Sequence, residues 1–147
     1  MIRLASLAIA AFFCFGTSVW ENDLDVAKQE AAKDNKYILL NFSGSDWCGP
    51  CIRLHKEIFD SQVFSDFAAK NLVLVNADFP RQKKNQLSKE QQGKNNKMAD
   101  QYNAQGSFPY TVLLDPQGKI IRSWDGFPGV SPEEFVAQLR ARVPEHN

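Results

Sequence analysis

Hydrophobic and polar residues follow two different spacings along the chain, and these spacings predict its helices and strands. Apolar residues three or four positions apart are typical of a helix with one buried face, whereas short unbroken apolar runs are typical of buried parallel strands. In the first half of the chain, helices are expected at 23–35, at 51–59 and from Val63 to Asn71, and strands at 36–43 and 72–78. A strand, a helix and a second strand in this order predict a right-handed βαβ unit.

The second half of the chain predicts two further strands between two helices. The expected elements are a helix through Met98, Ala99 and Tyr102 that ends near Gly106, strands at 110–114 and 119–124, and a last helix that begins at Ser131. Pro116 and Gly118 suit a tight turn between the two strands. Ser131 and Glu134 have the spacing of a capping box. The alternation of helices and strands predicts an α/β fold.

The first 18 residues have the pattern of a secretory signal peptide. Arg3 precedes an uncharged apolar stretch at 4–15, and the small residues Gly16, Thr17 and Ser18 follow it. We therefore expect cleavage after Ser18, which makes the protein periplasmic or otherwise exported. The alternative is an uncleaved membrane anchor, because the charge-free stretch approaches the length of about 17 residues that a spanning helix needs.

The remaining residues, 19–147, are long enough for one domain and too short for two. The chain has 17 basic and 17 acidic residues, so its bulk charge indicates neither a nucleic-acid partner nor a membrane surface. The stretch from Arg81 to Lys97 is locally rich in lysine. It is either a solvated loop and helix face, which is the commoner case, or a recognition site for an acidic partner.

Two cysteines, Cys48 and Cys51, remain once the leader is removed. A ring this short makes a poor structural staple, so a redox-active disulfide is favoured. Gly49 and Pro50 supply the tight turn between them, and the expected helix after them would stabilise a thiolate at its N-terminus. His55 is the nearest histidine, but no further ligands have metal-site spacing, so we expect a surface histidine and no metal.

The sequence Trp47-Cys48-Gly49-Pro50-Cys51 resembles the active-site motif of the thioredoxin-like family. Phe108-Pro109 before an apolar run resembles the second family motif, and the similarity extends from Asp23 to Val143. The resemblance implies a thioredoxin fold, with a central mixed β-sheet of four to five strands flanked by helices. It also implies a cis-proline, Pro109, before the third of the strands predicted above, facing the dithiol.

The resemblance further implies how the site works without a cofactor. Cys48 would be the exposed attacking thiol and Cys51 the buried resolving thiol, with Trp47 covering one edge of the site. The backbone of Phe108 would bind an extended substrate, and Gly126 would lie near the site. The expected partners are protein thiols and disulfides and a membrane protein that supplies electrons, with the protein acting as a monomer on the reductase side.

Two departures from thioredoxin itself affect the chemistry. The loop before Cys48 is one residue longer, and Asn41 replaces the buried aspartate that serves as a proton relay, while the lysine companion of that aspartate falls near Leu74. Asparagine does not exchange a proton at working pH, so Asp46 or water would take over the relay, or resolution would be slower. Two alternatives remain: a redox-inactive binding module for peptides or a partner, and a structural disulfide or metal clip.

Overall fold

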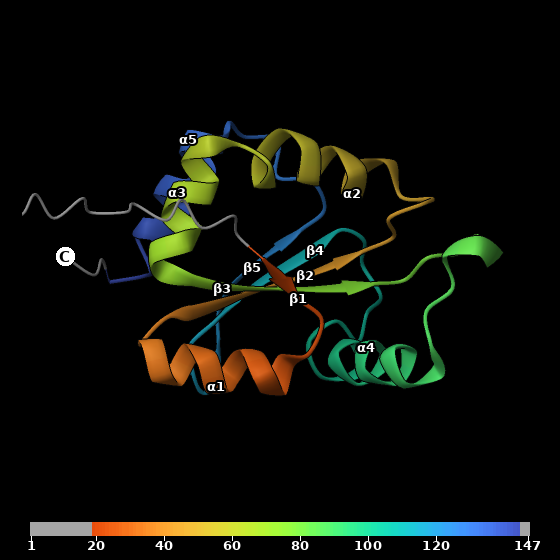
Figure 1. Cartoon of the computed structure of the whole chain (residues 1–147). Helices are drawn as coiled ribbons and strands as arrows, with labels where there is room; N and C mark the ends of the chain where they lie inside the picture. Colours follow the sequence, from red (N-terminus) through yellow and green to blue (C-terminus); the bar gives the residue numbers. More distant parts are fainter. Residues whose placement is uncertain (1–18, 145–147) are drawn as a thin grey trace, which may run out of the picture.

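The computed structural model describes residues 19–144, so the expected leader at 1–18 lies outside the described residues. Five strands form one mixed sheet in the order β1-β3-β2-β4-β5 (Figure 1). Strands β1 (Trp20–Glu21), β3 (Leu72–Asp78) and β2 (Tyr37–Ser43) are parallel, while β4 (Tyr110–Leu114) is antiparallel to β2 and β5 (Ile120–Asp125) is antiparallel to β4. The predicted mixed sheet is therefore confirmed, and β1 is the strand that the hydrophobic pattern did not predict.

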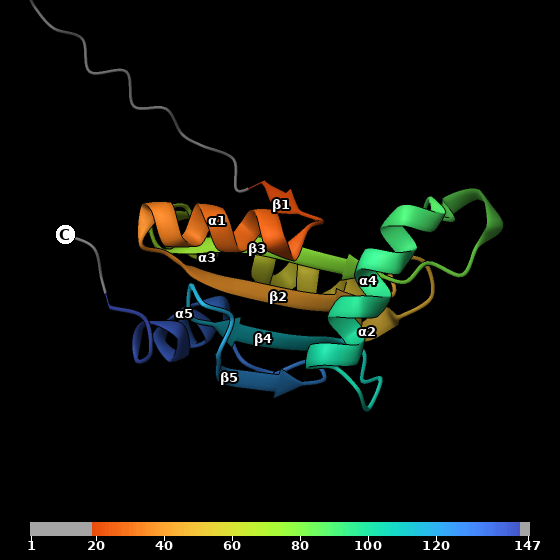
Figure 2. The ribbon, with the colours of Figure 1, turned by 90° about the horizontal axis from the view of Figure 1, so that it is seen from below.

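Helices cover both faces of this sheet (Figures 1 and 2). One face carries α2 (Gly49–Leu54), its π-helical continuation η1 (His55–Phe59), α3 (Gln62–Asn71) and α5 (Pro132–Arg140), and the other carries α1 (Leu24–Asp34) and α4 (Lys89–Tyr102). Each face has its own apolar core, because successive residues of β2 point to opposite sides: Leu39 packs towards α3 and α5, and Leu40 towards α1 and α4. Within residues 19–144, no helix has the length and apolarity needed to cross a membrane.

The helix boundaries follow from side-chain caps. Asp23, Ser61, Ser88 and Ser131 each accept a hydrogen bond from a backbone N–H of the first turn, and Ser131 forms the predicted capping box with Glu134. The prediction for the end of α4 was wrong by one turn, since the helix ends at Tyr102 rather than near Gly106. Ser88 also starts this helix inside the lysine-rich stretch, so that stretch is half connection and half helix.

Candidate active site

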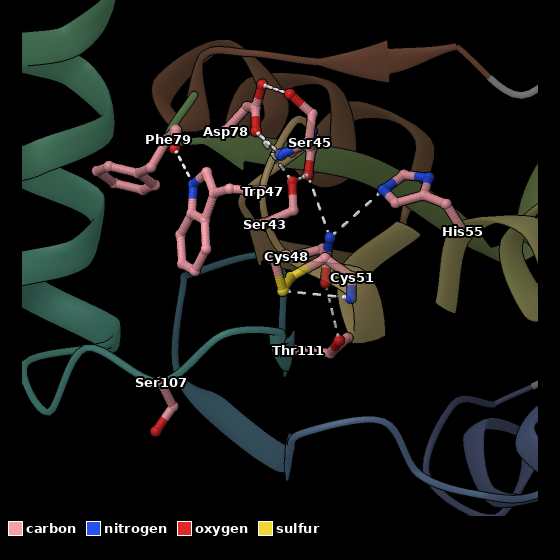
Figure 3. The surroundings of a disulfide bond; sticks show 12 residues. Ser43, Ser45, Trp47, Cys48, Cys51, His55, Asp78, Phe79, Ser107 and Thr111 are labelled. Carbon is pink, nitrogen blue, oxygen red and sulfur yellow. Dashed lines mark hydrogen bonds between the residues drawn. A yellow bond between two sulfur atoms is a disulfide. The ribbon is translucent and has the colours of Figure 1, made fainter. Parts of the chain in front are cut away.

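The two cysteines lie where β2 delivers the chain to α2 (Figure 3). Cys48 is the N-cap of α2, and Cys51 lies in its first turn. Their sulfur atoms form a disulfide, and the Cys48 sulfur also accepts a hydrogen bond of 3.3 Å from the backbone N–H of Cys51. The Cys48 sulfur thus accepts from a backbone N–H of the first helical turn, which has no carbonyl partner within the helix. This environment stabilises a thiolate.

The expectation that Cys48 is exposed was wrong for this oxidised state. Cys48 is 4% exposed and Cys51 is 1% exposed, so both residues are buried, although Cys48 is the less buried of the two. The physical reason is that the Cys48 sulfur turns back over the helix start, where it meets the Cys51 sulfur and the Cys51 amide. The order of exposure still matches the order of roles implied by the resemblance.

Trp47 stands beside the disulfide and is held from three sides. Its indole Nε1–H donates a 2.7 Å hydrogen bond to the carbonyl oxygen of Phe79, and its ring meets that of Phe108 edge-on at 5.5 Å. The guanidinium of Arg81 lies over the indole ring, 3.6 Å from the ring centre. Gly44 lies directly against the indole, where a Cβ atom would overlap the ring. These contacts fix the position of the Trp47 indole next to Cys48 in the chain.

Pro109 and Gly126 meet at the same end of the sheet as the cysteines. The Phe108–Pro109 peptide bond is cis, as the resemblance implied, and it directly precedes β4. The neighbouring Tyr110 pairs with Phe42 near the end of β2, which places Pro109 beside the loop that leads to Cys48. The Gly126 N–H donates a 2.9 Å hydrogen bond to the Pro109 carbonyl, and its φ of 80° favours glycine.

A row of buried and half-buried polar side chains crosses the sheet beneath the active-site helix (Figure 3). Asn41, which has no exposed surface, donates to the side-chain oxygen of Asn76 at 3.1 Å and accepts from the Thr111 hydroxyl at 3.0 Å. Ser43 donates to the same Asn76 oxygen at 3.2 Å. The sequence drew attention to Asn41 alone, and the strand register supplies its partner: Asn76 lies opposite Asn41, whereas Leu74 lies opposite Leu39.

Asp46, one of the two candidates for the proton relay, binds residues of the connection after β3 instead. Its carboxylate accepts hydrogen bonds of 2.9 Å from the backbone N–H groups of Arg81 and Gln82 and one of 3.0 Å from the Asn85 amide. The hydrogen bond from the Arg81 backbone, followed by that from Asn85, lowers the pKa of Asp46 below its usual value. The carboxylate thus fastens the active-site loop to the next connection and stays ionised.

The expectation of a surface histidine at position 55 was wrong. The His55 ring packs between Trp20 and Phe59, with ring centres 5.2 and 5.1 Å away, and its Nε2 lies 3.5 Å from the Asn41 side-chain nitrogen. Burial lowers the pKa of His55 below 6.5, while Asp60 and Asp78 raise it to a smaller extent. His55 is therefore a half-buried ring at the end of the polar row, with a lowered pKa that favours its neutral form. Within residues 19–144, no cluster of His, Cys, Asp or Glu is arranged to hold a metal.

Acid is expected to destabilise the fold through His55. The unfolded chain binds this proton more tightly than the folded one, so the contribution is complete above pH 6.5 and is lost as the pH falls from 6.5 towards the lower folded value. We expect His55→Gln to lose less unfolding free energy than the wild type between pH 7.5 and pH 5 in urea titrations. Carboxylates titrate in both proteins, so the difference between the two losses of unfolding free energy reports on His55. Equal losses would contradict the lowered pKa of this half-buried ring.

The fold and this site define the class: the protein is a thiol–disulfide oxidoreductase with a thioredoxin fold. Residues 24–142 match the description of a thioredoxin-like domain. The disulfide bond reductase DsbH of Chlamydia pneumoniae is 38% identical over 124 residues, which is 84% of this chain and 72% of that protein. The chain belongs to the thioredoxin-like family.

Solved structures agree with this assignment. A structure described as DsbH oxidoreductase superposes with a TM-score of 0.79 at 30% identity, covering 95% of this chain and 94% of the other. A disulphide isomerase from Xylella fastidiosa Temecula1 superposes with a TM-score of 0.59 at 21% identity, covering 79% and 87% of the two chains. The second match concerns the fold alone, whereas the first extends to the sequence.

Proposed function

We propose that the protein is an exported reductase of protein disulfides in which Cys48 attacks and Cys51 resolves. The observation that carries this proposal is the position of Cys48 at the N-cap of α2, less buried than Cys51 and within reach of a backbone donor. A relative with 38% identity is named a disulfide bond reductase, which favours the reducing direction. The expected leader at 1–18 is the ground for an exported location.

The exchange begins from the reduced dithiol. The Cys48 thiolate attacks one sulfur of a substrate disulfide, forms a mixed disulfide and releases the other substrate sulfur as a thiolate, which takes up a proton. The Cys51 thiol loses its proton, attacks the Cys48 sulfur and releases the second substrate thiolate. Two electrons have then passed to the substrate, and the Cys48–Cys51 disulfide remains. Because a reductant must restore the dithiol, we propose a membrane redox protein that supplies a dithiol of its own.

The substrate chain would lie against the end of the sheet where Pro109 meets Gly126. The backbone of Phe108 would pair with an extended substrate segment there, and Trp47, which contacts the Phe108 ring at 5.5 Å, would border it. A monomer suffices for this arrangement, since one chain supplies both cysteines and the neighbouring strand end.

A redox titration of the purified protein in glutathione and dithiothreitol buffers, followed by alkylation and mass measurement, tests the proposal. We expect a reversible two-electron transition near about −270 mV, as in thioredoxin. A value near about −120 mV, which is typical of a strong oxidant, would make the protein a disulfide donor instead. No reversible transition would favour the peptide-binding module, for which the low exposure of both cysteines, 4% and 1%, is the specific support.

A further inference from the structure

The connection between β3 and α4 carries a local positive charge at the active-site end of the molecule. Four cations and no carboxylate lie between Phe79 and Glu90: Arg81, Lys83, Lys84 and Lys89. Residues 81–85, which we name the basic segment, are all exposed and include the short 3₁₀ helix η2 (Lys83–Asn85). Figures 1 and 2 show this connection projecting beyond the sheet at the end where α2 begins.

The basic segment is fastened to the active-site loop and has a defined position. The Asp46 carboxylate accepts from the backbone N–H groups of Arg81 and Gln82 and from the Asn85 side chain, all within 3.0 Å. The Gln82 side chain returns a hydrogen bond of 3.2 Å to the Asp46 carbonyl. Asp46 comes two residues before Cys48 in the chain. These contacts hold both ends of the basic segment against the loop that leads to Cys48.

Arg81 is placed to bind a carboxylate. Its guanidinium carbon lies over the Trp47 ring, 3.6 Å from the ring centre, and a guanidinium held on an aromatic ring can still donate hydrogen bonds to a carboxylate. Among the described residues, no carboxylate forms an ion pair with this guanidinium or with the ammonium groups of Lys83 and Lys84. The cation of Arg53, on α2, is by contrast already paired with Glu57 at 2.7 Å. The Asp46 carboxylate binds the backbone of the basic segment, but among residues 19–144 none of the side chains of Arg81, Lys83 and Lys84 forms an ion pair.

We propose that the basic segment docks acidic side chains that flank the disulfide of a protein substrate. The inference rests on the proposed function, because a substrate disulfide at Cys48 brings the neighbouring substrate residues against Trp47 and Arg81. A carboxylate there pairs with the Arg81 guanidinium, and further acidic residues face Lys83 and Lys84. Charge of opposite sign raises the rate of encounter and selects the partner. The chain's formal net charge is zero, so the attraction is local to this end.

The test uses two synthetic disulfide peptides that differ only in whether glutamate or glutamine residues flank the cystine. The pre-reduced protein reacts with each, and stopped-flow kinetics give the second-order rate constants. We expect the glutamate peptide to react about tenfold faster at low ionic strength, and the ratio to fall towards one when salt screens the charges. In the variant Lys83→Glu/Lys84→Glu, the ratio should fall below one.

A matched control separates position from overall charge. The variant Lys33→Glu/Lys119→Glu makes the same change in net charge at the opposite end of the sheet, in the last turn of α1 and in the turn before β5. It should keep the tenfold ratio and the wild-type rate with the glutamine peptide.

Three results would overturn the inference, and they are distinguishable. Equal rates with the two peptides leave the oxidoreductase intact and remove the docking role. Equal rates together with binding to phosphatidylglycerol vesicles that Lys83→Glu/Lys84→Glu abolishes would assign the basic segment to a membrane surface. No reaction with either peptide would overturn the proposed function as well.

Discussion

Replacing Cys48 by serine is expected to abolish disulfide exchange, while replacing Cys51 by serine should trap the substrate. A serine hydroxyl is not ionised near neutral pH, so Cys48→Ser lacks the attacking group and should lower the exchange rate by about 10³-fold or more, as loss of a catalytic nucleophile does. Cys51→Ser keeps the attacking sulfur but cannot release the mixed disulfide. Intact mass measurement after incubation with a disulfide peptide should therefore find an adduct only for Cys51→Ser.

The double variant Cys48→Ser/Cys51→Ser is the control, because it should form no adduct and yet unfold cooperatively in urea. An adduct on Cys48→Ser, carried by Cys51, would reverse the proposed roles. Cys48 is 4% exposed and Cys51 is 1% exposed, so burial alone distinguishes the two cysteines only weakly. The trapping experiment therefore tests the assignment of their roles directly. Equal trapping by both single variants would show that the position at the helix start does not make Cys48 the preferred attacking thiol.

The variant Gly44→Ala is expected to displace the Trp47 indole and thereby to disrupt the active site, although Gly44 takes no part in the exchange reaction. An added Cβ would overlap the Cε2 and Nε1 side of the indole, which is a rigid ring and must move as a whole. The hydrogen bond to the Phe79 carbonyl and the stacking of Arg81 would be lost together. We expect a loss of about 1–3 kcal/mol of unfolding free energy, as overpacking produces, and slower reaction with disulfide peptides.

Gly93→Ala provides the matched control for this substitution. Gly93 lies within α4, where an added Cβ would meet nothing within 4 Å, so the same chemical change should stabilise the helix by up to about 1 kcal/mol. Urea unfolding measures both variants, and the tryptophan emission of the native state reports the displaced indole. Native-like stability and emission for Gly44→Ala would mean that Trp47 accommodates the methyl group without moving.

The sequence predicted best those features whose evidence is local. The dithiol at a strand–helix junction, the proline before β4 and the capping box at Ser131 each lie within a few residues, and the structure contains all three. Strand β1 was not predicted because two residues, Trp20 and Glu21, are too few to show a period. Their pairing with β3 depends on a neighbour more than fifty residues away in sequence.

The parts of the site that the sequence did not predict depend on contacts between distant segments. His55 has the sequence surroundings of a surface residue, and only the fold brings Trp20 over it and Asn41 beside it. The sequence leaves Asp46 as one candidate for the proton relay, but the partners of its carboxylate lie in the connection after β3. The overlap that a Cβ atom at position 44 would have with the Trp47 ring likewise depends on the position in which the Phe79 carbonyl holds this ring.

The shared direction of the three parallel strands determines at which edge of the sheet a partner meets the dithiol. Strand β1 runs parallel to β3, and β3 runs parallel to β2, whose last residue leads into the loop before Cys48. Trp20 and Glu21 pair with Leu74 and Val75 in the middle of β3, so the chain joins the sheet well before the edge at which the dithiol lies. Strands β2 and β3 both end at that edge, and the loop to Cys48 and the connection to α4 begin there. A partner that reaches Cys48 therefore meets the carboxyl ends of parallel strands and the two connections that follow them.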